Sequence, residues 1–150
     1  MRIFTLITAA ALAFTPVMTQ AADPITKPST HSVSETIDRL AAAVKAAGAK
    51  VVARVNHSGA AASVGMELRP TEMLMFGNPK LGTPAMQAGQ TAGLDLPLRV
   101  LAYQDEDGQV FIVYHNPAEL SADHGIPANA PVLKKMAGAL DKLTNKAIGE

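Results

Sequence analysis

The sequence contains no cysteine and no tryptophan, and aromatic residues make up only 4% of its 150 positions. Without cysteine, disulfide bonds, thiol chemistry and thiolate metal sites are excluded, so the core must stabilise the fold unaided. The scarcity of aromatic side chains argues against stacking platforms for nucleic acid bases. The 13 basic residues balance the 13 acidic ones, so no basic field attracts nucleic acid either. We therefore expect no nucleic acid partner.

What is present is a globular composition, with 48% hydrophobic and 17% charged residues. A chain of this length holds one domain with a real core and is too short for two ordinary domains. No apolar stretch beyond the N-terminal one approaches the length of a membrane span. The composition thus predicts a single domain over residues 31–150, with residues 22–30 as a linker or an edge strand before it.

The N-terminus has the pattern of an export signal. Arg2 supplies a positive charge, residues 3–14 are apolar and uncharged, and Thr19-Gln20-Ala21 resembles a small-x-small cleavage site. A membrane anchor is the alternative, but the apolar run is short for a span. We expect residues 1–21 to be a signal peptide that is removed, leaving a periplasmic or secreted protein without a membrane partner.

The first half of the mature chain carries clear helix and strand signals. Ser32 and Glu35 fit a capping box, and apolar residues then recur at helical spacing, which predicts a helix over residues 34–47. Residues 50–57 are rich in β-branched side chains and predict a strand. Residues 58–66 are rich in small side chains and fit a short helix or a loop; we favour the helix.

The middle of the chain begins with an apolar strand, expected over residues 71–76. Apart from Glu72 this strand is apolar on both faces, which predicts a central strand or one whose second face is covered by a helix or a partner subunit. Gly77-Asn78-Pro79 ends it. Thr83 is a suitable N-cap and Pro84 fits the first helical position, so a short helix is expected over residues 83–88.

The last third of the chain predicts a hairpin followed by a helix. Residues 98–104 and 109–115 flank an acidic turn that ends in Asp-Gly, the strongest hairpin signal in the chain. Residues 117–122 fit a helical turn, and an apolar stripe marks the last helix over residues 130–148. Because helices and strands do not alternate strictly, we predict an α+β fold with a mostly antiparallel sheet.

Several motifs along this chain together resemble one family. They are Arg69-Pro70-Thr71-Glu72, Phe76-Gly77-Asn78-Pro79, Gly82-Thr83-Pro84 with Met86, and Gly93-Leu94-Asp95-Leu96-Pro97. In order, spacing and flanking strands the chain resembles the domain-of-unknown-function 302 family over about residues 30–147. The resemblance implies a helix-backed, mostly antiparallel sheet in β-α-β4-α order, similar to the TATA-binding-protein-like fold. It also implies small, often exported, dimeric proteins of unassigned activity; likeness to a DNA-binding architecture carries no function by itself.

Five residues are candidates for a ligand-binding site. His57 suits proton transfer or metal ligation, although a structural role at a strand end is the more frequent case. Asn78 either fixes its turn or presents its amide to a ligand, and Thr83 either caps a helix or helps to bind an anion. Asp95 either forms a turn or pairs with His57 as an acid–base dyad. Gln87 is a weaker member, and no catalytic residue is assigned.

A metal site is not expected. Histidine and methionine in an exported protein suggest copper, since thioethers suit Cu(I). However, Met73 and Met75 share one face of an apolar strand, and Met86 and Met136 fit packing positions. Methionine as an adaptable core filler is the better account. The sequence has no His-x-His pair, and no Ser-His-Asp order or nucleophile elbow supports hydrolysis. We expect no metal and no cofactor.

The sequence therefore favours a small exported domain that binds a small molecule or a protein partner. The first alternative is a homodimeric interaction protein that associates through the second sheet face. In that case a charge substitution at Glu72 or Phe76 is expected to dissociate the dimer. The second alternative, which we favour least, is an enzyme that uses His57 as a general acid–base.

Overall fold

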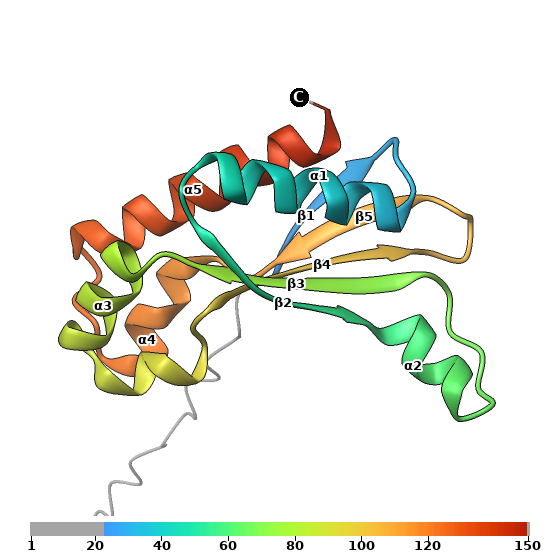
Figure 1. The fold of residues 1–150 in the computed structure, drawn as a ribbon. Helices are drawn as coiled ribbons and strands as arrows, with labels where there is room; N and C mark the ends of the chain where they lie inside the picture. The colour runs from blue at the N-terminus through green and yellow to red at the C-terminus, as the bar shows by residue number, and fades with distance from the viewer. Residues whose placement is uncertain (1–22, 150) are drawn as a thin grey trace, which may run out of the picture.

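The computed structural model describes residues 23–149. This part of the chain forms the following elements: β1 (Ile25–Ser29), α1 (Val33–Ala46), β2 (Lys50–Asn56), α2 (His57–Ser63), β3 (Thr71–Gly77), α3 (Pro79–Ala88), the 3-10 helix η1 (Gln90–Leu94), β4 (Leu98–Gln104), β5 (Val110–Tyr114), the 3-10 helix η2 (Pro117–Glu119), α4 (Leu120–His124) and α5 (Pro131–Ile148). The α+β class is confirmed (Figure 1). The expected signal peptide, residues 1–21, lies outside the described residues.

The five strands form one antiparallel sheet in the order β1-β5-β4-β3-β2. The predicted β4–β5 hairpin is present, and β3 lies inside the sheet between β4 and β2. The segment expected as a linker or an edge strand contains β1, which pairs with β5 at one edge of the sheet. Pro28 is tolerated there because an edge strand has one side free of ladder hydrogen bonds.

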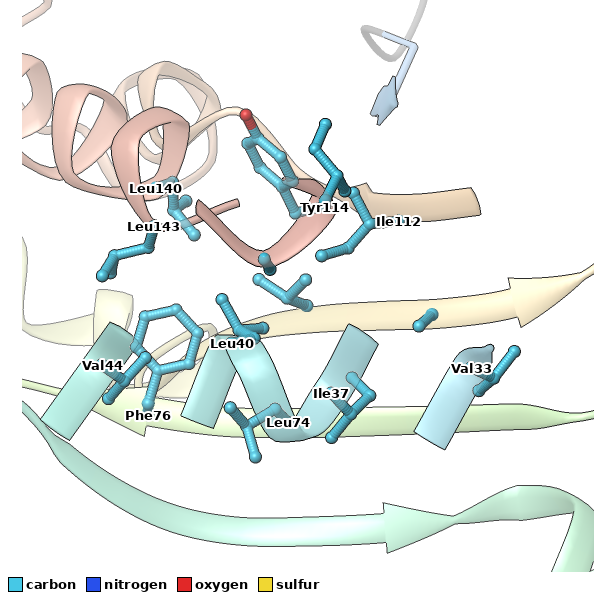
Figure 2. Close-up of a cluster of buried hydrophobic side chains, with 14 of the residues drawn as sticks. Val33, Ile37, Leu40, Val44, Leu74, Phe76, Ile112, Tyr114, Leu140 and Leu143 are labelled. Atoms are coloured by element: carbon cyan, nitrogen blue, oxygen red, sulfur yellow. The ribbon is translucent and has the colours of Figure 1, made fainter. Parts of the chain in front are cut away.

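The two long helices, α1 and α5, pack side by side over one face of the sheet (Figure 1). Alternate residues of the strands point into this layer, and Figure 2 shows Leu74 and Phe76 of β3 opposite Leu40 of α1. Burying side chains of this size contributes roughly 1.5–3 kcal/mol each. A smaller second cluster, centred on Met136, joins α3, η1 and α4 to the beginning of α5.

The capping signals acted as expected in part. Ser32 caps α1, its hydroxyl accepting from Glu35 N at 3.2 Å, but the Glu35 carboxylate reaches His31 rather than back to the cap. The expected helix over 83–88 is wrong at its start. Asn78 caps α3, its side chain accepting from Lys80 N at 3.0 Å, so Thr83 and Pro84 lie inside the helix.

The second face of the sheet carries apolar side chains and has no helix packed across it in the described part of the chain (Figure 1). We call it the open face; it holds Val55, Met73, Met75, Leu101, Tyr103, Phe111 and Val113. All seven are half-buried.

Two expectations about β3 are therefore wrong. Glu72 and Phe76 are buried beneath the helices and do not lie on the open face, so they cannot test an interface there. Met73 and Met75 lie on the open face and are not core filler. The sequence of β3 is apolar on both faces, and strand periodicity alone does not say which face the helices cover. It therefore could not predict which of these residues are buried.

Candidate binding cavity

A cavity of about 440 Å³ lies where the ends of β2 and β3 meet α3 and α5. Its walls are almost entirely apolar, with Phe76, Leu96 and Leu143 among the larger contributors. Three polar side chains belong to the residues that line it: Lys50, Asn78 and Thr83. A mostly apolar cavity with a few polar groups is the usual form of a small-molecule site.

Local irregularities of the backbone make room for this cavity. The register of β2 against β3 shifts between Val51 and Ala53, and the intervening Val52 is 58% exposed and lines the cavity. On the neighbouring strand, Gly77 pairs with Lys50, and Asn78 then turns the chain into α3. Bulges near a sheet edge commonly redirect side chains in this way.

Three of the four motifs singled out in the sequence converge on this cavity. All four residues of Phe76-Gly77-Asn78-Pro79 line it, as do Gly82, Thr83 and Met86, and Gly93, Leu96 and Pro97. The fourth motif, Arg69-Pro70-Thr71-Glu72, lies at the other end of β3. Separate pieces of sequence thus form one wall because β3, α3 and η1 follow one another around the same space.

The five candidate residues do not form one site. Asn78 and Thr83 line the cavity, Gln87 is exposed on α3 outside the lining, and Asp95 lies beside it. His57 begins α2 at the far end of β2, because Lys50 pairs with Gly77 whereas Asn56 pairs with Glu72. The length of β2, about 3.3 Å per residue, puts His57 roughly 20 Å from Asn78. His57 and Asn78 therefore share no pocket.

Asp95 pairs with His124 and not with His57. Its Oδ2 lies 2.7 Å from His124 Nε2, and its Oδ1 accepts from Arg99 at 2.7 Å. The hydrogen bond with His124 lowers the pKa of Asp95; burial opposes this shift, and the charges of Arg99 and His124 add to it. The His124 side chain is only 6% exposed, and its Nδ1 lies 3.0 Å from Thr91 Oγ1.

Sequence reasoning missed His124, which joins α4 to η1. The helical turn was expected over 117–122, and the only local signal is that Gly125, with a φ of +67°, ends α4 immediately after His124. Close approach at this junction also requires Gly89, where a Cβ would lie 2.5 Å from the carbonyl oxygen of His124. The contact between Gly89 and His124 packs α4 against the segment that supplies Gly93 and Leu96 to the cavity.

The histidines of the described residues differ in their partners. Among residues 23–149, no carboxylate lies within salt-bridge distance of His57, although the other three histidines each have one. No group of three or more His, Asp or Glu side chains in this range is placed to hold a metal ion. The polar side chains among the residues that line the cavity are those of Lys50, Asn78 and Thr83.

A family model described as "Domain of unknown function DUF302" matches residues 25–143. The chain belongs to the DUF302 family. The resemblance identified from the motifs is thereby confirmed, and the match spans both the cavity and the open face.

Curated proteins are similar to this DUF302 chain over part of their own length. The chain is 42% identical over 127 residues to "Fluoride-specific ion channel FluC 1" of Brucella suis biovar 1 and of Brucella abortus biovar 1, which covers 84% of the chain and 50% and 47% of those proteins. The chain thus spans about half the length of these curated relatives. No helix among residues 23–149 combines the length and the apolar character needed to span a membrane.

A solved structure has the same fold. The crystal structure of an uncharacterized conserved DUF302 protein from Bacillus stearothermophilus matches with a TM-score of 0.74, covering 83% of this chain and 97% of that one. Sequence identity is 21%, so this likeness shows the fold alone.

Proposed function

We propose that this DUF302 chain binds a small apolar molecule in the cavity between α3, α5 and the ends of β2 and β3. The observation that carries the proposal is the convergence of three separate sequence motifs on one apolar space of about 440 Å³. Glycine and proline commonly serve a turn or a close packing contact, and four of them line the cavity: Gly77, Pro79, Gly82 and Pro97. Neither role requires these residues to surround one hollow space. A binding site accounts for it.

A cavity-filling substitution tests this proposal. Ala139 of α5 lines the cavity, whereas Ala137 is equally half-buried on the same helix and does not. We expect the neutral probe N-phenyl-1-naphthylamine to bind the wild-type protein and Ala137→Leu saturably at one site, and Ala139→Leu to bind it at least about tenfold more weakly. Equal binding by Ala139→Leu, or no saturable binding by the wild type, would contradict the proposal.

The N-terminal pattern supports a location outside the cytoplasm for this binding function. We propose that residues 1–21 are removed on export and that the mature protein acts in the periplasm or is secreted. Native mass spectrometry of the protein purified from that compartment reads the mature N-terminus and any retained ligand together. A chain that retains residues 1–21 would argue against export with cleavage.

A second candidate function, self-association, is favoured by the open face. Seven half-buried apolar side chains cover it, and the Tyr103 and Phe111 rings stack there with centroids 5.8 Å apart. We propose a second copy of this chain as the occupant. Arg99, the cross-strand partner of Met75, adds a charge to this face and is paired with Asp95. The apolar side chains around it can complement the same surface on a second copy, as an interface with twofold symmetry requires. The oligomeric state of the protein in solution tests this proposed self-association directly.

A further inference from the structure

Charge is segregated beside the cavity although the chain as a whole is neutral. Helix α5 carries four lysines and one acidic residue, a net charge of +3, against zero for the whole chain. Lys135, Lys142 and Lys146 recur at intervals of seven and four residues, which places them along one side of the helix. Together with Lys134 they line a shallow hollow.

This lysine-lined hollow adjoins the cavity directly. Ala47, Ala139 and Leu143 line both spaces, so the rim of the apolar cavity is also the rim of the cationic hollow. Lys50 lines the cavity itself from the beginning of β2. An apolar space and a concentration of positive charge thus share one border.

The lysines at this border are not neutralised by the described part of the chain. Asp141, the acidic residue of α5, accepts from Lys27 Nζ at 2.7 Å on the side of the helix that faces β1. Within residues 23–149, no carboxylate lies within 4 Å of the amine of Lys50, Lys142 or Lys146. Lys142 and Lys146 are also four residues apart on one helix, a like-charge spacing that disfavours the helix without an anion nearby.

The other two polar side chains of the cavity lining, Asn78 and Thr83, can also donate to an acceptor, and the Thr83 hydroxyl can accept as well. Asn78 Oδ1 already accepts from Lys80 N at 3.0 Å, so its side-chain amide nitrogen is the part left to donate. Lys50 and the α5 lysines offer donors only. The cavity and its border therefore match a molecule with an apolar body and a negatively charged, acceptor-rich end.

We infer that the ligand is an amphiphile with an anionic head group, its apolar part in the cavity and its carboxylate or phosphate beside Lys50 and the α5 lysines. This inference rests on the proposed binding function and adds the chemical class of the ligand.

Three probes with the same alkyl tail separate the inference from the proposed function. Decanoate and decyltrimethylammonium below their micelle concentrations, and decanol below its solubility limit, are titrated into the wild-type protein with calorimetric detection. We expect decanoate to bind roughly fivefold more tightly than decanol, as an exposed ion pair allows, and the cation to bind most weakly. Equal binding of all three would overturn the inference and leave the proposed function standing. Binding of none would overturn both.

Variants that remove a positive charge test which lysines cause the preference for decanoate over decanol. Lys142→Gln and Lys146→Gln, which lie outside the cavity lining, are expected to remove most of the advantage of decanoate while leaving decanol binding unchanged. Arg69→Gln, which removes an exposed charge at the far end of β3, is the control for net charge and is expected to bind both probes as the wild type does. If decanoate keeps its advantage in both lysine variants, the head group does not lie at this border and the inference fails. Decyl phosphate in place of decanoate then distinguishes a phosphate from a carboxylate preference.

Discussion

At the scale of single residues, the clearest departure from pattern is a carboxylate inside an apolar strand. Glu72 is buried beneath the helices, and its Oε2 accepts from Arg54 Nε at 2.6 Å. Arg54 also pairs with Asp38 of α1, so one guanidinium links β2, β3 and a helix. The hydrogen bond to Glu72 is the main cause that raises the pKa of Arg54. The charge of Glu72 is thus tolerated because Arg54 neutralises it.

Removing Arg54 alone is expected to be costly. Arg54→Leu leaves the Glu72 carboxylate buried without a cation, which should lower the free energy of unfolding by about 3 kcal/mol, measured by urea denaturation. The double variant Arg54→Leu/Glu72→Leu is expected to be more stable than Arg54→Leu, because it removes the unpaired charge as well. A loss under about 0.5 kcal/mol for Arg54→Leu, a surface-pair value, would show that Glu72 is not effectively buried.

At the scale of elements, the contact between η1 and α4 is held by Asp95, His124 and Arg99. The folded protein keeps the pKa of Asp95 below its ordinary value of 3.8. A carboxyl with a lowered folded pKa stabilises the fold above its unfolded pKa, and that stabilisation is lost as the pH falls through the folded pKa. The contact is thus expected to weaken in acid.

Asp95→Asn tests the sign of this effect. At pH 6 the variant is expected to be less stable than the wild type, and the difference should shrink as the pH falls below the ordinary pKa of 3.8 and Asp95 becomes protonated in the wild type. Urea unfolding over this range measures it. Asp123→Asn, on the exposed side of α4, should leave the pH profile unchanged. A difference between wild type and Asp95→Asn that stays constant with pH would show that the charge of Asp95 does not hold the two elements together.

Elements with local signals were predictable from the sequence, and contacts distant in sequence were not. The β4–β5 hairpin and α5 followed from a turn dipeptide and an apolar stripe, which neighbouring residues alone produce. The start of α3 was misplaced because Thr83-Pro84 and Asn78-Pro79 carry the same cap-then-proline signal five residues apart. The pairing of Asp95 with His124 spans 29 residues and has no local signature. The same holds for the cavity. Its motifs can be found in the sequence, but only the three-dimensional structure shows that they lie around one space.

At the scale of the whole molecule, the sequence predicted the order of elements and left open which face of each strand is covered. Strand alternation divides a strand into two sets of side chains, and the covering helices, α1 and α5, decide which set is the core. For β3, with apolar side chains on both faces, the outcome rests on Glu72 and its partner Arg54, both on the helix side. Because Glu72 and Phe76 lie beneath the helices, the proposed interface instead involves the other face of β3, with Met73 and its cross-strand partner Leu101.

The open face gives the last prediction, which concerns assembly. Met73 lies on an inner strand of the open face, so Met73→Lys would bury an unpaired ammonium in any interface formed there, at a cost of several kcal/mol. We expect the wild-type protein to sediment as a dimer and Met73→Lys as a monomer at the same concentration. Met66→Lys, in the exposed segment between α2 and β3, should remain dimeric.

Cavity binding separates the two proposed functions. Because Met73 and the cavity lie on opposite sides of β3, Met73→Lys is expected to bind N-phenyl-1-naphthylamine as the wild type does. A wild-type monomer at all concentrations, or a Met73→Lys dimer, would contradict association through the open face. Loss of probe binding in a folded Met73→Lys monomer would instead show that the cavity depends on assembly, since two copies would then be needed to hold α3 and η1 in place.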